Sequence, residues 1–90
     1  MSLVRNGRAR LALALPRHRQ KLRAIKNQEM EDLFEAYALA AGAIESLRNE
    51  YPLREELLRE YQNLCLDMQA EVVAFLEGRP VPDAPQPRDE

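Results

Sequence analysis

The sequence is poor in the residues that build catalytic, metal-binding or disulfide-linked sites. It has no tryptophan, one cysteine and one histidine among 90 residues. A single cysteine cannot form a disulfide within the chain, and one cysteine with one histidine cannot supply the ligands of a zinc site. The three glycines stand apart, so the sequence has no glycine-rich phosphate-binding loop. These absences predict a protein that is not an enzyme and carries no cofactor or metal.

Long apolar runs are also missing. The longest uninterrupted run covers residues 36–41, which is far too short to span a bilayer. A chain of 90 residues forms one small domain at most, because a short chain buries little of its surface. One unpaired cysteine gives no sign of an oxidising compartment. We therefore expect a soluble, cytoplasmic protein.

Charge is distributed very unevenly along the chain. Residues 1–28 contain eight Lys or Arg and no Asp or Glu. The remaining residues contain the other five Lys or Arg and all fifteen Asp or Glu, so the formal net charge of −2 hides two oppositely charged segments. Such asymmetry is typical of an interaction arm joined to a folded body. We define residues 1–26 as a basic arm, which we expect to be flexible or partly helical.

The first helix is predicted over residues 28–50. Asn27 suits an N-cap, and Glu29 and Glu31 place negative charge on the first turn, where the helix dipole favours it. Apolar residues then recur at steps of three and four, the spacing of one helix face. Pro52 disfavours helical geometry at the residue before it and so predicts where this helix ends.

The second helix is predicted over residues 52–77. Pro52 suits its first position, because proline has a fixed φ and needs no N–H donor there. An apolar stripe follows, about 140° wide on a helical wheel. Gly78 suits the left-handed residue that ends a helix. Four prolines within residues 79–90 predict a disordered tail.

Two long helices joined by a short turn must fold back on each other. We therefore predict an all-α protein in which residues 27–78 form an antiparallel two-helix hairpin. Two helices bury only the seam between them, so stripes this wide need further cover, from a second copy that completes a four-helix bundle or from a partner protein. The residues expected to make this protein interaction are Leu33, Phe34, Tyr37, Ile44, Leu57, Leu58, Tyr61, Leu64, Met68, Val72 and Phe75.

Neither reactive side chain lies in a catalytic motif. Cys65 lies on the apolar stripe of the second helix, which indicates a buried structural thiol. His18 lies among the arginines of the basic arm, which indicates a solvated member of a basic patch. The predicted function is a non-enzymatic protein-protein interaction module. Its build suggests a small regulator or adaptor, of the antiactivator, anti-sigma or chaperone type, that binds a protein partner or itself through the hairpin.

The basic arm has several interpretations. It can grip an acidic protein surface, including the acidic body of a neighbouring subunit. It can contact nucleic-acid phosphates, although it has no aromatic residue to stack on bases. An organelle transit peptide and a membrane-surface helix are further alternatives. The residues expected to contact nucleic acid or an acidic partner are Arg8, Arg10, Arg17, Arg19, Lys21 and Arg23.

A sharper form of the nucleic-acid alternative comes from residues 8–15. Leucine or alanine at the odd positions alternates with arginine or alanine at the even ones, which is the period of a half-buried strand, and Pro16 suits the start of a helix. This stretch resembles the start of a ribbon-helix-helix repressor or antitoxin, over residues 8–49. The resemblance implies paired strands that enter the major groove of DNA, with Arg8 and Arg10 facing the groove.

Overall fold

The computed structural model describes residues 2–78, which form four α-helices and one short 3-10 turn. The all-α prediction is confirmed for this part of the chain, in which no strand occurs. The tail predicted over residues 79–90 lies outside the described residues. In chain order the elements are α1 (Leu3–Ala14), the 3-10 turn η1 (Pro16–His18), α2 (Arg19–Ala24), α3 (Gln28–Arg48) and α4 (Glu55–Leu76).

The two long helices begin where the sequence supplies favourable first turns. Asn27 accepts a hydrogen bond at Oδ1 from the N–H of Met30 at 3.1 Å, so α3 begins where its cap predicts. α4 begins at Glu55, later than the expected Pro52. Two acids occupy its first turn, where they interact favourably with the helix dipole. Residues 49–54, including Pro52, form the connection that reverses the chain direction between α3 and α4.

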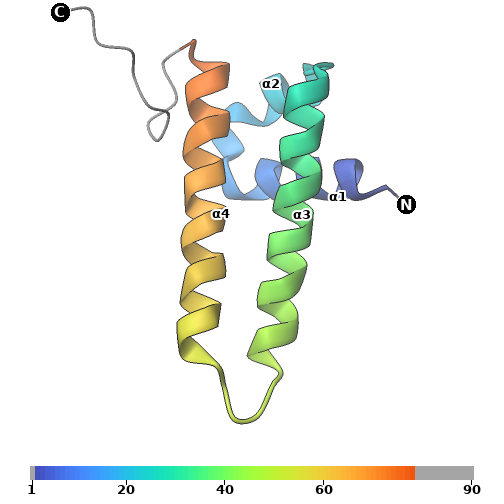
Figure 1. The fold of residues 1–90 in the computed structure, drawn as a ribbon. Helices are drawn as coiled ribbons and strands as arrows, with labels where there is room; N and C mark the ends of the chain where they lie inside the picture. Colours follow the sequence, from blue (N-terminus) through green and yellow to red (C-terminus); the bar gives the residue numbers. More distant parts are fainter. Residues whose placement is uncertain (1, 79–90) are drawn as a thin grey trace, which may run out of the picture.

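Figure 1 shows α3 and α4 side by side and running in opposite directions, with α1 and α2 behind them. α1 crosses α3, and α2 lies near the end of the pair where α3 begins and α4 ends. The chain therefore covers one face of the α3–α4 pair with its own first residues. None of the described helices combines the length and apolar character needed to cross a membrane.

The basic arm is helical, and the strand predicted over residues 8–15 is wrong. Ser2 caps α1, because its Oγ accepts a hydrogen bond from the N–H of Arg5 at 3.0 Å. The leucines of this stretch alternate as in a strand, but Leu11 also lies four residues after Gly7, and these two buried residues share one face of α1. Packing of that face against α3 selects the helix, and the resemblance to a ribbon-helix-helix protein loses the strand on which it depended.

One apolar cluster joins the four helices. Leu11 of α1, Leu22 of α2, Phe34 of α3 and Val72 of α4 have no exposed surface. Full burial of a side chain of this size stabilises the fold by about 1.5–3 kcal/mol. On the face of the α3–α4 pair that packs against α1 and α2, the chain itself supplies the apolar contacts that we expected from a second molecule. The other buried members of the cluster are Met30, Tyr37, Ala40, Cys65 and Met68.

α1 crosses α3 at Gly7, where the two backbones meet. Gly7 is buried, and a Cβ atom added to it would overlap the carbonyl group of Phe34 and lie 3.1 Å from the Phe34 Cα. Any larger residue would therefore push α1 away from α3. Because protein interiors are close-packed, that displacement would uncover Leu11.

We expect Gly7→Ala to lower the free energy of unfolding by about 1–3 kcal/mol or more, as overpacking does in a tight core. Gly42 in α3 is the matched control, because a Cβ there meets no atom within 4 Å. Gly42→Ala should raise stability by about 0.5–1 kcal/mol, since alanine favours a helix more than glycine. Urea unfolding followed by far-UV circular dichroism measures both. Equal stabilities of the two variants would contradict the close crossing.

Candidate functional site

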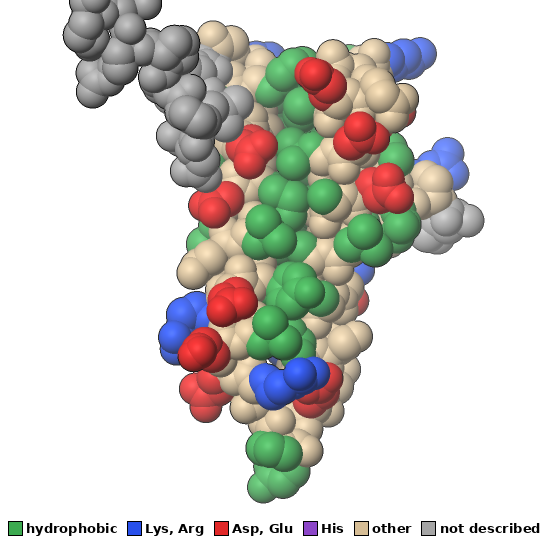
Figure 2. All heavy atoms as spheres, in the orientation of Figure 1, with side chains coloured by type: hydrophobic (Ala, Val, Ile, Leu, Met, Phe, Trp, Pro, Cys, Tyr) green, Lys and Arg blue, Asp and Glu red, His purple; other side chains and the backbone are tan. Residues whose placement is uncertain are grey.

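The face of α3 and α4 that points away from α1 and α2 carries an exposed apolar stripe (Figure 2). Leu64 and Phe75 of α4 are each 45% exposed, and Leu33 and Leu57 are half-buried. Steps of seven and eleven residues separate the three α4 positions, which places them on one helix face. We call Leu33, Leu57, Leu64 and Phe75 the front stripe.

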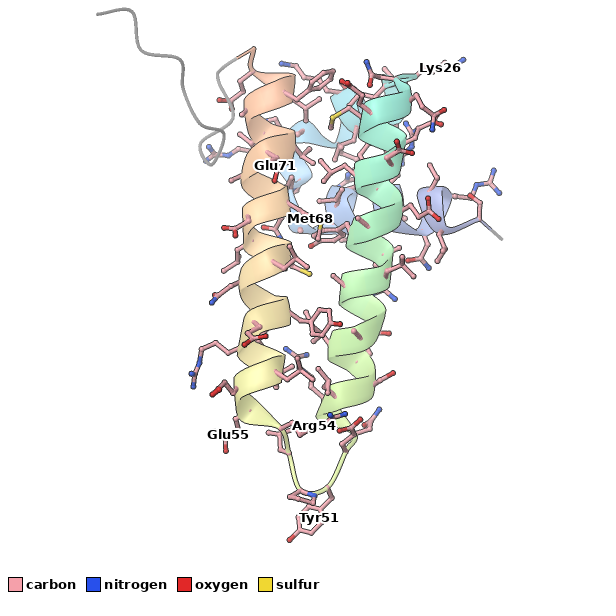
Figure 3. All side chains as sticks on the ribbon, viewed as in Figure 1. Lys26, Tyr51, Arg54, Glu55, Met68 and Glu71 are labelled. Atoms are coloured by element: carbon pink, nitrogen blue, oxygen red, sulfur yellow. The ribbon has the colours of Figure 1, made fainter. Side chains whose placement is uncertain are left out.

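A groove of about 310 Å³ opens at one end of the front stripe, between the start of α3 and the end of α4. Glu29, Met30 and Leu33 line it from α3, and Glu71 and Phe75 line it from α4. Figure 3 shows Glu71 on the side of α4 that faces α3, one turn beyond Met68. The groove therefore has apolar walls with one carboxylate from each helix at its rim.

Acidic side chains flank the front stripe (Figure 2). On α4 the residues Glu56, Glu60, Asp67 and Glu71 are separated by steps of four and seven, so they form a row beside Leu64. None of these four forms a salt bridge within the described part of the chain. The front stripe is thus an apolar surface beside a row of uncompensated negative charge.

The residues predicted for the protein interaction divide into a buried and an accessible set. Phe34, Tyr37, Met68 and Val72 belong to the core of the single chain, and the Tyr37 hydroxyl accepts a hydrogen bond from Nε2 of Gln69 at 2.8 Å. These four cannot touch a partner unless the fold opens. Accessible surface remains on Leu33, Ile44, Leu57, Leu58, Tyr61, Leu64 and Phe75.

Arg8, a predicted contact for an external partner, joins α1 to α2. Its Nη1 donates hydrogen bonds to the carbonyl oxygens of Leu22 at 2.6 Å and Ile25 at 2.9 Å, at the end of α2. Helix ends leave such carbonyls unpaired and favour positive charge. The guanidinium carbon also lies 4.9 Å from the centre of the Phe34 ring, a cation–π contact. Arg8 is therefore engaged inside the chain.

Arg10 pairs with Glu45 of α3. Its Nη1 lies 2.9 Å from Oε2 and its Nη2 lies 3.3 Å from Oε1, while its Nε donates to Oδ1 of Asn6 at 2.6 Å. The hydrogen bond from Arg10, and then its positive charge, lower the pKa of Glu45 below the usual range. The Glu45 side chain is 61% exposed, so solvent screens this pair.

The other predicted basic residues remain exposed on η1 and α2. Arg17, Arg19, Lys21 and Arg23 form no salt bridge with any described residue. Arg5 on the first turn of α1 is likewise exposed. These five cations belong to the segment that packs behind α3 and α4 in Figure 1, on the opposite side from the front stripe.

The lone histidine and the lone cysteine both lie in structural positions. His18 is not solvated as predicted: its side chain is 16% exposed, and its Nε2 lies 3.1 Å from Oε2 of Glu77, which ties η1 to the end of α4. Cys65 is buried as predicted, and burial raises the pKa of its thiol. Within residues 2–78, no three His, Cys, Asp or Glu side chains gather closely enough to hold a metal ion.

Comparison of the chain with protein-family models, curated proteins and solved structures gives no match. Two surfaces of the described residues remain as candidate functional sites. One is the front stripe with its acidic row, and the other is the exposed basic surface of α1, η1 and α2.

We expect Arg8→Ala to lower the free energy of unfolding by about 1–3 kcal/mol, because the carbonyls at the end of α2 would lose their donor. Arg8→Lys should recover only part of this, since an ammonium lacks the planar fork of a guanidinium. Thermal unfolding measures all variants. Arg5→Ala is the control on the same helix and should change stability by less than about 0.5 kcal/mol. If Arg8→Ala and Arg5→Ala behave alike, the capping role is wrong.

We expect Glu45→Gln to remove a pH-dependent contribution to stability. The folded-state pKa of Glu45 lies below its ordinary value of 4.5, so the contribution is present above that pH and is lost as the pH falls through the folded pKa. The stability difference between wild type and variant, measured by denaturant unfolding, should therefore shrink on acidification. Added salt should shrink it at neutral pH. A difference that stays constant with pH would contradict the ion pair.

Proposed function

We propose that the chain is a non-enzymatic protein-protein interaction module whose front stripe binds an amphipathic helix of a partner chain. The observation that carries the proposal is the exposure of Leu64 and Phe75, each 45%, beside a groove of about 310 Å³ between two helices. Large contiguous apolar surfaces on soluble proteins mark interaction sites. A third helix can lay its apolar side chains into a groove of this kind, which would complete the two-helix hairpin of α3 and α4.

The acidic residues beside the stripe favour one kind of partner helix. Glu29 and Glu71 lie at the rim of the groove, and Asp67 continues the row along α4. A helix whose apolar face is bordered by Lys or Arg would place positive charge against these carboxylates. A helix bordered by acids would be repelled. We therefore propose a basic, amphipathic helix as the occupant.

A second copy of the chain is the other cover considered for the hairpin. Symmetric pairing through the front stripe would build a four-helix bundle from two α3–α4 pairs. Two-fold symmetry brings the same surface of both copies together, and so it brings the acidic row of one copy close to that of the other. Because like charges at an interface are destabilising, we favour the basic helix over a symmetric homodimer on this face.

The build of the chain is consistent with a small regulator or adaptor. A protein that sequesters a helix of another protein needs an exposed groove and little else, as in antiactivators, anti-sigma factors and assembly chaperones; this comparison is an analogy of size and build. We propose the cytoplasm as its compartment, on the basis of its single, buried thiol.

A synthetic peptide tests the proposal directly. We expect a fluorescent amphipathic helix, with leucines on one face and lysines beside them, to bind the wild-type chain in an anisotropy titration. Leu64→Asp and Phe75→Asp should each weaken binding roughly tenfold or more, because the new charge is desolvated without a partner. Leu66→Asp is the matched control, since Leu66 is 60% exposed two residues along α4 and points away from the front stripe.

The peptide also has a charge control. Exchange of its lysines for glutamates should weaken binding, because the acidic row then repels it. Far-UV circular dichroism checks that each protein variant keeps its helices. Equal affinity of the wild type and both front-stripe variants would rule out this surface as the binding site.

A further inference from the structure

A second groove, of about 450 Å³, lies between α1 and α2 on the basic side of the molecule. Ala9, Ala12 and Leu13 supply its apolar lining, and Leu13 is 83% exposed. Arg5, Arg19 and Arg23 line the same groove. A neighbouring groove of about 430 Å³, lined by Arg17, Gln20 and Lys21, continues the basic surface across α2. We call the 450 Å³ groove the basic groove.

The cations of the basic groove are not neutralised within the described part of the chain. Arg8 also lines it, but its Nη1 already donates hydrogen bonds to the carbonyl oxygens of residues 22, 23 and 25. Arg5, Arg19 and Arg23 are exposed and form no salt bridge among residues 2–78. The sequence has no Asp or Glu before residue 29. The groove therefore suits a ligand that presents apolar side chains flanked by negative charge.

α4 presents such a surface. Leu64 and Phe75 form an exposed apolar ridge, and Asp67 and Glu71 lie beside it. These two acids are four residues apart on one helix face. Arg19 and Arg23 have the same spacing on α2. An α4 helix laid along the basic groove could thus pair both acids with both arginines while its apolar ridge covers the alanines that line the groove.

The two surfaces cannot meet within one chain. Figure 1 places α1 and α2 behind the α3–α4 pair, whereas the front stripe faces the opposite way. Two copies can join them. We propose that the chain self-associates head to tail, with the α4 ridge of one copy docked in the basic groove of the next. This inference rests on the proposed function, because it names a second copy of this chain as the partner of the front stripe.

The geometry of this contact predicts its assembly behaviour. A head-to-tail contact uses two different surfaces, so every added copy leaves one front stripe and one basic groove free until a ring closes. The mass in solution should therefore rise with protein concentration instead of stopping at a dimer. Much of the attraction comes from exposed charges, so salt should weaken it.

Nucleic acid fits the basic groove less well than α4 does. Phosphates would neutralise the arginines, but they would make no favourable apolar contact with the alanines of the groove or with the exposed Leu13. Residues 1–28 contain no aromatic side chain that could stack on bases. A groove lined by arginines alone would suit a phosphate ligand. Because this groove combines arginines with apolar residues, it favours an acidic, amphipathic helix.

Charge reversal tests the proposal. The groove variant carries Arg5→Glu and Arg19→Glu, and the stripe variant carries Asp67→Lys and Glu71→Lys. Neither pair should weaken its helices: Arg5→Glu supplies the acid of a capping box that begins at Ser2, position 19 begins α2, and lysines suit the C-terminal half of α4. Circular dichroism checks this. Multi-angle light scattering at low salt, over a series of concentrations, measures the mass.

We expect the wild type to rise above the monomer mass of 10.4 kDa, and each variant alone to remain at that mass. An equal mixture of the two variants should associate again, because each altered surface then meets one of opposite charge. A chain with all four substitutions should also associate by itself. A general loss of solubility or folding would not be rescued by mixing, so rescue is specific to the proposed pairing.

Three results would overturn the proposal. A wild type that stays monomeric at every concentration in low salt excludes self-association. A groove variant that associates like the wild type excludes the basic groove. A monomeric wild type that binds duplex DNA or phosphatidylglycerol vesicles, and loses that binding in the groove variant, assigns the groove to a phosphate ligand. In each case binding of the lysine-flanked peptide to the front stripe would still stand, which separates this failure from that of the proposed function.

Discussion

The close crossing of α1 over α3 at Gly7 is the contact on which the rest of the structure depends. It brings Leu11 into the apolar cluster that contains Phe34 and so closes one side of that cluster. Arg8 extends the contact, because its guanidinium donates a hydrogen bond to the Leu22 carbonyl oxygen near the end of α2 and also lies over the Phe34 ring. Two short helices that would be unstable alone are thus held by packing and by one partly buried guanidinium.

The same crossing gathers the exposed cations of the N-terminal segment on one face of the molecule. Residues 2–24, which contain no acid, pack against one side of the α3–α4 pair, so the cations of this segment that form no salt bridge collect there. The acids of α4 remain beside the front stripe. An uneven charge distribution along the sequence becomes, through this packing, an uneven distribution in space. Electrostatic complementarity sets the orientation of an approaching partner more than its affinity, so such a molecule should select how it is approached.

The sequence predicts α3 and α4 well because both combine a strong first turn with a long apolar period. It predicts α1 poorly, since residues 8–15 fit a strand and a helix equally and Gly7 is unfavourable in an isolated helix. The site is predictable only in part for the same reason. Phe34 and Leu64 lie on equally apolar stripes, yet one is fully buried and the other 45% exposed. The position of α1 decides which of the two is buried. That position depends on the backbone contact between Gly7 and Phe34, which no local sequence pattern predicts.

Helix lengths explain why the described part of the chain leaves the front stripe uncovered. α1 has 12 residues and spans about 18 Å, whereas α3 has 21 and spans about 31 Å. Residues 2–24 therefore cover one face of the α3–α4 pair over part of its length and leave Leu64 and Phe75 exposed on the other. Among residues 2–78 nothing covers Leu64 and Phe75, so their burial needs a further apolar surface, such as the helix proposed above. Because the core on the first face is complete without it, that helix can come and go while the chain stays folded, as a reversible binding surface requires.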